Sequence, residues 1–324
     1  MILCLTHSKD YYTIDIVLNK LRALGKEAYR IDTDLFSDQL IFDFNGDNNT
    51  FNSTIQTENY SFSLKDVEAV WYRKLWAITP PSELDPAFRE IFTQEYITMR
   101  NIFFESLQDV PWMNPMMIDH EIGNNKLIQL KIAAQNDIHI PESLFTNDSS
   151  KVREFFHEKC NGQMIAKLHG ALTRSMSGDV PFFPTTLITE DNLDQLDTLR
   201  YCPMIFQKLI EKSYELRIAY VDGVFFAGKI NTEESIRGKT DWRVASDITF
   251  FWEHYELPVA VENALTKMMQ QMGLFFGAID MMRHKDGRYI FLEVNPQGEW
   301  GMLQRDLNYP IGETIAEKLI ARIA

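Results

Sequence analysis

Two apolar runs, residues 277–284 and 289–295, flank an Asp-Gly pair near the end of the chain. An Asp-Gly pair between two such runs predicts a β-hairpin. If Asp286-Gly287 forms a two-residue loop, the strand pairing places Asp280 directly opposite Glu293. The hairpin therefore predicts two carboxylates at one spot on one face of a sheet.

A metal ion would explain why two acids share that spot. Like charges directly opposite each other on a sheet repel, whereas a hard divalent cation attracts both. Asn295 lies on the same face as Glu293, because side chains alternate along a strand. Three oxygen ligands with room for phosphate oxygens indicate a magnesium site. The alternative is an exposed hairpin face with solvated acids, but acids inside such apolar strands need a compensating partner.

The chain begins with a strand, a helix and a second strand. Residues 1–5 are apolar, residues 11–24 carry apolar side chains at helical spacing, and residues 28–31 form a second apolar run. This βαβ unit implies a parallel sheet with a right-handed crossover. A single core is near its size limit at 324 residues. We therefore predict an α/β protein with α+β lobes, divided at residues 1–118, 119–210 and 211–324. Further helices are predicted at residues 83–108, 119–135, 151–158, 259–272 and 311–323.

The charge balance argues against several partners. The chain has 32 Lys and Arg residues against 46 Asp and Glu residues, a formal charge of −14. Duplex nucleic acid and anionic membranes demand excess cations on the contact face, so neither is expected as a partner. No apolar run is long enough to span a bilayer, and the three cysteines lack metal-site or redox spacing. We expect a cytoplasmic protein with reduced thiols.

Common catalytic motifs are missing from the sequence. It contains no G-x-G-x-x-G, H-E-x-x-H, C-x-x-C or G-x-S-x-G, which removes the usual support for Rossmann dehydrogenases and nucleophilic hydrolases. Residues 238–240 read Gly-Lys-Thr like the end of a P-loop, but Glu233 stands where that loop needs Gly. We therefore do not predict a P-loop.

Phosphates around a magnesium ion would need nearby cations. Lys167 ends a short apolar strand before the Gly- and Ser-containing loop 169–179, and Lys126 lies near the start of a helix. Each is equally compatible with a solvated lysine. Arg217 and Arg243 lie among apolar and aromatic residues, where an unpaired guanidinium would be costly. They are therefore the better candidates for binding phosphate or carboxylate.

Short stretches from end to end of the chain carry a family resemblance. They are Leu5-Thr-His-Ser8, Ile31-Asp-Thr-Asp34, Val70-Trp-Tyr-Arg73, Asn125-Lys-Leu-Ile-Gln129, Tyr201-Cys-Pro-Met-Ile-Phe-Gln207, Glu215-Leu-Arg217, Asp241-Trp-Arg243 and Phe291-Leu-Glu-Val-Asn-Pro296 with Gly298-Glu299. The Glu-x-Asn-Pro pattern resembles the ATP-grasp superfamily. Trp-Tyr-Arg, Glu-Leu-Arg and Asp-Trp-Arg together resemble its graspetide synthetases, which mature microviridin-type ribosomal peptides.

The resemblance implies an ATP-grasp fold and a peptide-cyclising ligase. The fold would have a βαβ pre-ATP-grasp N-lobe, a small lid lobe and a C-terminal antiparallel-sheet lobe. With ATP and Mg²⁺, a side-chain carboxylate of a precursor peptide would become an acyl phosphate. A Ser/Thr hydroxyl or Lys amine of the same peptide would then displace phosphate and close an ester or amide ring. Such chemistry depends on positioning and charge neutralisation, which fits a site rich in Lys, Arg and Mg²⁺.

The resemblance also implies nucleotide-binding residues by position. Lys126 and Lys167 would hold ATP phosphates, and Lys229 is a further candidate phosphate ligand. Glu211 would meet the ribose. The interlobe hinge would read adenine through the backbone of Gln207, Lys208, Leu209 and Ile210.

The remaining implied roles concern catalysis, metal and peptide. Arg217 and Arg243 are the catalytic candidates and would face the γ-phosphate or the acyl phosphate. Asp280, Glu293 and Asn295 would bind Mg²⁺. The leader of the precursor peptide would dock on the small lobe, near Asn192 and Gln195.

Two other functions share the same C-terminal residues. One is a different ATP-grasp carboxylate-amine ligase, such as an enzyme that adds glutamate to a protein terminus. The other is a nucleotide-binding scaffold without catalysis, which is disfavoured because the metal ligands and several cations are all present. The sequence leaves open whether the product is an ester or an amide, how many rings form and in which order. It also leaves open which precursor is used and whether the protein forms a homodimer.

Overall fold

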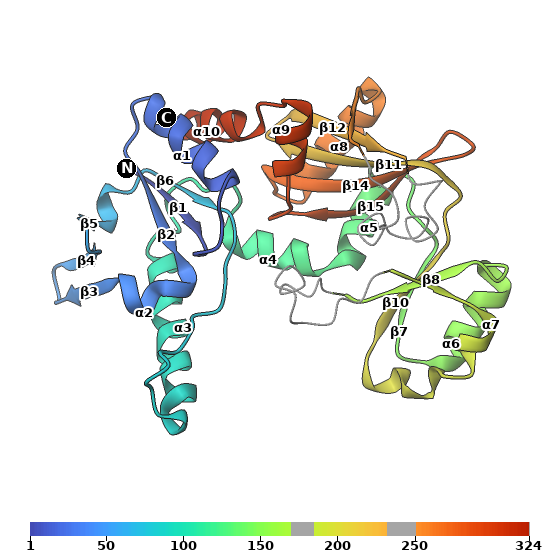
Figure 1. Cartoon of the computed structure of the whole chain (residues 1–324), viewed down its shortest axis with the longest axis horizontal. Helices are drawn as coiled ribbons and strands as arrows, with labels where there is room; N and C mark the ends of the chain where they lie inside the picture. The colour runs from blue at the N-terminus through green and yellow to red at the C-terminus, as the bar shows by residue number, and fades with distance from the viewer. Residues whose placement is uncertain (170–184, 232–250, 324) are drawn as a thin grey trace.

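The computed structural model describes residues 1–169, 185–231 and 251–323 (Figure 1). Arg243, the Gly-Lys-Thr stretch at 238–240 and most of the loop 169–179 lie outside these residues. Among the residues that are described, no helix is both long enough and apolar enough to cross a membrane. Mixed sheets and helices form an N-terminal lobe, a small lobe and a C-terminal lobe, which confirms the α/β prediction.

A three-stranded parallel sheet is the centre of the N-terminal lobe. Its order is β2 (Ala28–Asp32), β1 (Ile2–Thr6), β6 (Ala69–Tyr72), and α1 (Thr13–Ala23) joins β1 to β2 as the predicted βαβ unit. The apolar side of α1 packs on α10 (Ile311–Ala321) from the end of the chain, as Figure 1 shows. The two ends of the sequence therefore close a shared core.

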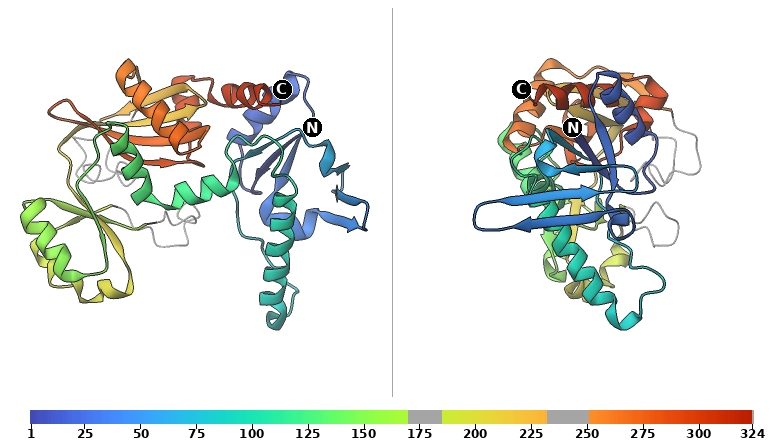
Figure 2. Two further views of the ribbon diagram at one scale, coloured as in Figure 1. Left: turned by 180° about the vertical axis from the view of Figure 1, so that it is seen from behind. Right: turned by 90° about the vertical axis from the view of Figure 1, so that its left-hand side faces the viewer.

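The rest of the N-terminal lobe extends away from this sheet. A second, antiparallel sheet contains β3 (Ile41–Gly46), β4 (Phe51–Gln56) and β5 (Ser61–Ser63). The helix predicted at 83–108 is shorter, because Asp85 caps a 3-10 turn by accepting a hydrogen bond from the backbone of Ala87 at 2.9 Å. That turn, η3 (Pro86–Phe88), leads into α3 (Arg89–Glu105), which projects from the lobe in Figure 2. The remaining short elements are η1 (Thr33–Leu35), α2 (Phe36–Gln39) and η2 (Leu64–Asp66).

Two linker helices replace the single helix predicted at 119–135. They are α4 (Met116–Asn124) and α5 (Lys126–Gln135), and Asn125 separates them. The backbone of Asn125 is not helical, and its side chain accepts a hydrogen bond from Ile128 N at 3.0 Å. This N-cap starts a new helix and makes Lys126 its first residue.

The small lobe is a four-stranded antiparallel sheet covered by short helices. Its order is β7 (Ser143–Thr146), β10 (Met204–Lys208), β8 (Met164–Lys167), β9 (Thr186–Ile188). Phe156 and Phe206 are buried in its core. The covering elements are α6 (Ser149–Glu154), the π-helix η4 (Phe155–Lys159), α7 (Glu190–Leu193) and η6 (Leu196–Tyr201).

The C-terminal lobe is a five-stranded antiparallel sheet. Its order is β13 (Glu253–Tyr255), β12 (Val224–Ile230), β11 (Lys212–Val221), β14 (Phe276–His284), β15 (Tyr289–Asn295). One face packs on α5 and α8 (Val259–Gln271) through an apolar cluster that includes Ile218 and Phe291. The other face contacts α9 (Gly301–Leu307) near one end and is polar near the other.

The hairpin of β14 and β15 has the predicted pairing for a different reason. Gly287 N donates to His284 O and His284 N to Arg288 O, so the loop contains three residues instead of two. Met281 consequently pairs with Phe291, one residue out of the predicted register. A bulge then inserts one residue into β15 and restores the pairing of Asp280 with Glu293.

Candidate active site

A row of three charged side chains crosses the polar face of the C-terminal sheet. Arg217 in β11 lies opposite Asp280 in β14, which lies opposite Glu293 in β15. Arg217 Nη1 is 2.8 Å from both carboxylate oxygens of Asp280. Arg217 is buried and pairs with a carboxylate, as its apolar surroundings predict. Antiparallel pairing places all three side chains on one face.

Lys126 provides the counter-charge at the other end of this row. It begins α5, and its Nζ contacts Glu293 Oε2. Asn295 Nδ2 donates to the other oxygen of Glu293, Oε1, at 3.2 Å. Each carboxylate of the pair therefore has its own cation, Arg217 for Asp280 and Lys126 for Glu293. The sequence argument did not include these two side chains as compensating partners. The assignment of a magnesium ion to this spot stays a prediction.

The donor atoms nevertheless fit a magnesium ion. Asp280, Glu293 and Asn295 supply carboxylate and amide oxygens, which are the hard ligands that Mg²⁺ prefers. In the part of the chain that the structure describes, no three His, Cys, Asp or Glu side chains are grouped so as to hold a metal. Mg²⁺ next to a nucleotide normally takes its other ligands from phosphate and water. Two carboxylates and an amide are therefore sufficient protein ligands for such an ion.

The loop after β15 joins this row to the N-terminal lobe. Arg217 donates to Glu299 O from Nη2 at 2.9 Å and from Nε at 3.2 Å. A Cβ atom on Gly298 would lie 2.3 Å from the Cβ of Ala278 and 2.9 Å from Arg217 Nη2. Only glycine fits here without displacing the β14 side chain and the arginine.

Arg73 and Lys74, at the end of β6, meet the same loop. Arg73 Nη2 lies 2.7 Å from Glu299 Oε2, its Nη1 donates to Gln297 O at 2.8 Å, and Lys74 Nζ contacts Glu299 Oε1. Burial alone would raise the pKa of Glu299, but Arg73 and Lys74 outweigh it and hold that pKa at about 2. The Glu299 carboxylate is therefore ionised at neutral pH. Sequence reasoning gave these three residues no role, although side chains at the carboxyl ends of parallel strands commonly meet ligands.

The buried carboxyl group of Asp119 in α4 also contacts the loop after β15. Gln297 Nε2 donates to Asp119 Oδ1 at 2.5 Å and to Tyr72 Oη at 2.9 Å. Burial raises the pKa of Asp119 to about 7, against the hydrogen bonds from Gln297 and Asn114. The loop that follows Asn295 is thus fixed by groups from the N-terminal lobe and the linker.

The predicted adenine hinge connects the small lobe to β11. Gln207 is buried and donates from Nε2 to Ser143 Oγ at 2.8 Å, while Lys208 forms an ion pair with Glu142 at 3.5 Å. Leu209 N donates to Gln163 O, Lys212 N to Ile210 O, and Lys285 N to Glu211 O. Lys167 ends β8 of the same small-lobe sheet, in register with Ile205 of β10. Hydrogen bonds to the small lobe and to the β14–β15 hairpin therefore hold the hinge in place.

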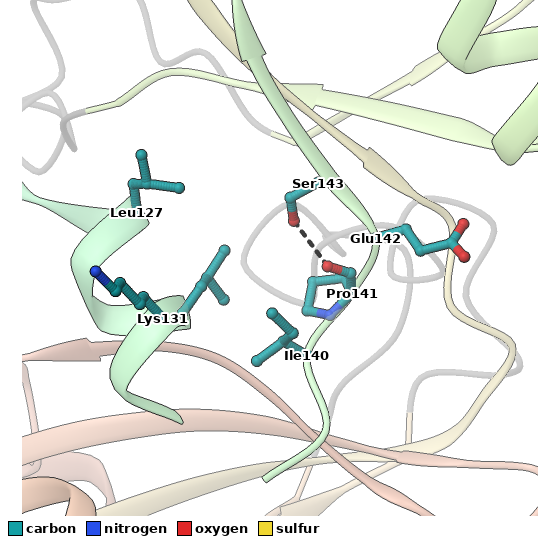
Figure 3. Close-up of a pocket in the computed structure, with 7 residues that line it drawn as sticks. Leu127, Lys131, Ile140, Pro141, Glu142 and Ser143 are labelled. Carbon is teal, nitrogen blue, oxygen red and sulfur yellow. Dashed lines mark hydrogen bonds between the residues drawn. The ribbon is translucent and has the colours of Figure 1, made fainter. Parts of the chain in front are cut away.

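A groove of about 350 Å³ opens beside this hinge (Figure 3). In Figure 3, Leu127 and Lys131 of α5 lie across from the segment 140–143, which leads into β7. The walls are mainly apolar.

Three predicted residues are not gathered at this site. Lys229 lies opposite Leu216, so it is on the face of the sheet away from Arg217. There it pairs with Glu253 at 3.0 Å, and this placement argues against a phosphate-binding role. Asn192 uses its side-chain oxygen to cap α7, by accepting from Thr189 N at 2.9 Å, and Gln195 follows in the turn after α7. Both belong to the small lobe, as predicted. The second catalytic candidate, Arg243, is outside the described residues.

Comparison with known proteins agrees with this architecture. The family model for the MvdD pre-ATP grasp domain matches residues 1–120. No curated protein matches the chain. Among solved structures, macrocyclase MdnC bound with precursor peptide MdnA from Microcystis aeruginosa MRC is 32% identical, with 99% of each chain covered and a TM-score of 0.87. Macrocyclase MdnB from the same organism is 35% identical, with 98% of each chain covered and a TM-score of 0.83.

A third similar structure is named as an ATP-grasp ligase. The RiPP-associated ATP-grasp ligase of Chryseobacterium gregarium, in complex with ADP and a leader and core peptide, is 30% identical over 99% of this chain and 96% of that chain, with a TM-score of 0.88. The chain belongs to the graspetide-type ATP-grasp ligases. The family resemblance and the ATP-grasp fold predicted from the sequence are therefore confirmed, and the chain is an enzyme of the ligase class.

Proposed function

We propose that this ligase uses ATP and Mg²⁺ to cyclise a ribosomally made precursor peptide. An Asp or Glu side-chain carboxylate is activated as an acyl phosphate and is then joined to a Ser/Thr hydroxyl or a Lys amine of the same peptide. The observation that carries this proposal is the row Arg217, Asp280, Glu293 with Lys126, in a chain that matches peptide macrocyclases over its whole length.

The charges of this row support phosphoryl transfer. When bound, Mg²⁺ neutralises phosphate charge and polarises the transferred group. Asp280, Glu293 and Asn295 are the proposed ligands. Arg217 and Lys126 are paired to two of those ligands in the described structure, so both cations are within reach of any phosphate that approaches them. They orient and neutralise the reacting groups without acting as bases.

The nucleotide would lie between the small and C-terminal lobes. The segment Gln207, Lys208, Leu209, Ile210 and Glu211 is the covalent connection on that side, since it joins β10 directly to β11. We assign its backbone to adenine and Glu211 to the ribose. Lys167 at the end of β8 is assigned to the phosphates, together with Lys126.

The leader of the precursor would bind the small lobe. A groove of about 480 Å³ lies there between the π-helix and the segment that leads into α7, with Phe156, Leu187, Ile188 and Leu209 among its walls. Leu187 is 44% exposed, so a bound peptide could cover it. The groove is close in sequence to Asn192 and Gln195, and its apolar walls suit apolar leader side chains.

The test is to incubate the purified protein with ATP, Mg²⁺, free glutamate and a leader-containing precursor peptide, for which MdnA is one available probe. Loss of one water from the peptide per ring supports cyclisation. Gain of an amino-acid mass would support the glutamate-ligase alternative, and peptide that stays unchanged without ATP consumption would support a scaffold. Glu293→Gln should remove turnover, whereas the exposed control Glu95→Gln should keep it.

A further inference from the structure

An anion-binding pair lies at the carboxyl end of β6, on the N-terminal lobe. Arg73 and Lys74 both bind the carboxylate of Glu299, which comes from the loop after β15. A planar guanidinium and an ammonium on one carboxylate make a strong, directional anion site.

The exposures of the partners are unequal. The side chain of Arg73 is 1% exposed, whereas that of Glu299 is 40% exposed. A buried guanidinium needs a partner, because an unpaired charge in the interior is costly. The Glu299 side chain, in contrast, can turn into solvent. An incoming carboxylate could therefore replace Glu299 without leaving Arg73 unpaired.

One atom of this pair and one atom of a neighbouring histidine are unsatisfied. Among the described residues, Arg73 Nε and His7 Nδ1 are buried and have no hydrogen-bond partner. His7 is 5% exposed and stacks on Trp76 with ring centroids 3.7 Å apart. Buried polar atoms without partners are rare in native proteins and commonly mark a place for a ligand or water. The carboxyl ends of β1 and β6 thus carry buried polar atoms that could make more hydrogen bonds than the described residues supply.

The pair is also next to the proposed phosphate site. Glu299 accepts from Arg217 through its backbone oxygen and from Arg73 and Lys74 through its side chain. A carboxylate in place of the Glu299 side chain would therefore lie beside the residue whose backbone oxygen binds Arg217.

We propose that Arg73 and Lys74 form the subsite for the reacting Asp or Glu carboxylate of the peptide, and that Glu299 fills this subsite until the substrate displaces it. The inference rests on the proposed function. The Glu299 carboxylate competes with the substrate carboxylate for Arg73 and Lys74. It keeps Arg73 paired when no substrate is bound, and it lowers the apparent affinity for substrate. A side chain without a carboxylate cannot make the exchange, so the subsite selects acids.

Calorimetry without ATP or precursor tests this exchange. The probe is N-acetylglutamate α-amide, and the matched probe without a charge is N-acetylglutamine amide. Glu299→Gln should bind the acid more tightly than the wild type, by roughly tenfold or more, because the internal carboxylate reduces the fraction of wild-type molecules that are competent to bind. Lys74→Met should lose binding. Exposed controls, Glu83→Gln and Lys65→Met, should bind like the wild type.

Several results would overturn the inference. They are equal affinity of the wild type and Glu299→Gln, unchanged binding by Lys74→Met, equal binding of the uncharged probe, tighter binding of inorganic phosphate than of the acid, or no binding by any form. Thermal melts of each variant show that it is folded. Because this assay needs no turnover, a protein that cyclises peptide but fails it keeps the proposed function and loses only the subsite.

Discussion

Replacing Asp119 by asparagine should remove a pH dependence from the stability of the fold. Asp119 is 2% exposed, and its Oδ2 has no hydrogen-bond partner among the described residues. Burial raises its pKa from 3.8 to about 7. Between these values the folded chain keeps a proton that the unfolded chain has released, so the free energy of unfolding falls as the pH rises through this window. The full difference corresponds to about 4 kcal/mol.

The asparagine side chain of the Asp119→Asn variant carries no titratable proton, so the variant should not show this loss. Urea denaturation of the wild type and of the variant at several pH values between about 4 and 8 measures it. The difference in unfolding free energy between the two proteins should change by about 1.4 kcal/mol per pH unit in the middle of the window, in favour of the variant as the pH rises. Other titrating groups cancel in this difference. Parallel stability curves would refute the reasoning, and exposed Asp109→Asn is the control that should give them.

Three further predictions concern the active site. Glu293→Gln should lower turnover by at least about a hundredfold, because it removes a proposed charged metal ligand; its melting temperature should fall, because Lys126 loses its partner, but the variant should still unfold cooperatively above the assay temperature. Steady-state rates and thermal melts check this, and normal rates would contradict it. Gly298→Ala should lower both stability and turnover, because its Cβ would lie 2.3 Å from Ala278 Cβ. A melting temperature equal to that of the wild type would show that the loop can accommodate the added methyl group. Lys126→Met should raise the apparent KM for ATP, since it removes a proposed phosphate contact. Initial rates at several ATP concentrations measure this KM, and an unaltered KM would exclude that contact.

The register of the hairpin of β14 and β15 shows how sequence reasoning can reach a correct pairing for an incomplete reason. The pairing of Asp280 with Glu293 was predicted from a two-residue loop at Asp286-Gly287. The structure has a three-residue loop and a bulge in β15, which offset each other. Turn residues indicate that a hairpin exists, but loop length and bulges depend on tertiary contacts. Here the Lys285 backbone donates to Glu211 in the hinge, which sequence cannot show.

The partners of the charged residues were harder to predict than the residues themselves. The apolar neighbours of Arg217 predict a guanidinium that is paired with an anion. Its partner Asp280 lies on the adjacent strand, and that strand order requires the fold of the whole lobe. Arg73 and Glu299 are 226 positions apart and meet only because two lobes pack together. Lys229 illustrates a related point, since a shift of one residue moves a strand side chain to the other face of the sheet, and its role as a phosphate ligand stays a prediction.

Transfer of oxygen from substrate to phosphate tests the central claim most directly. A precursor peptide whose core carboxylates carry a heavy oxygen isotope is incubated with the protein, ATP and Mg²⁺, and the released phosphate is analysed by mass spectrometry. If a carboxylate is activated as an acyl phosphate, each ring closure should place one labelled oxygen in phosphate. Ring closure with unlabelled phosphate would contradict this account of the site.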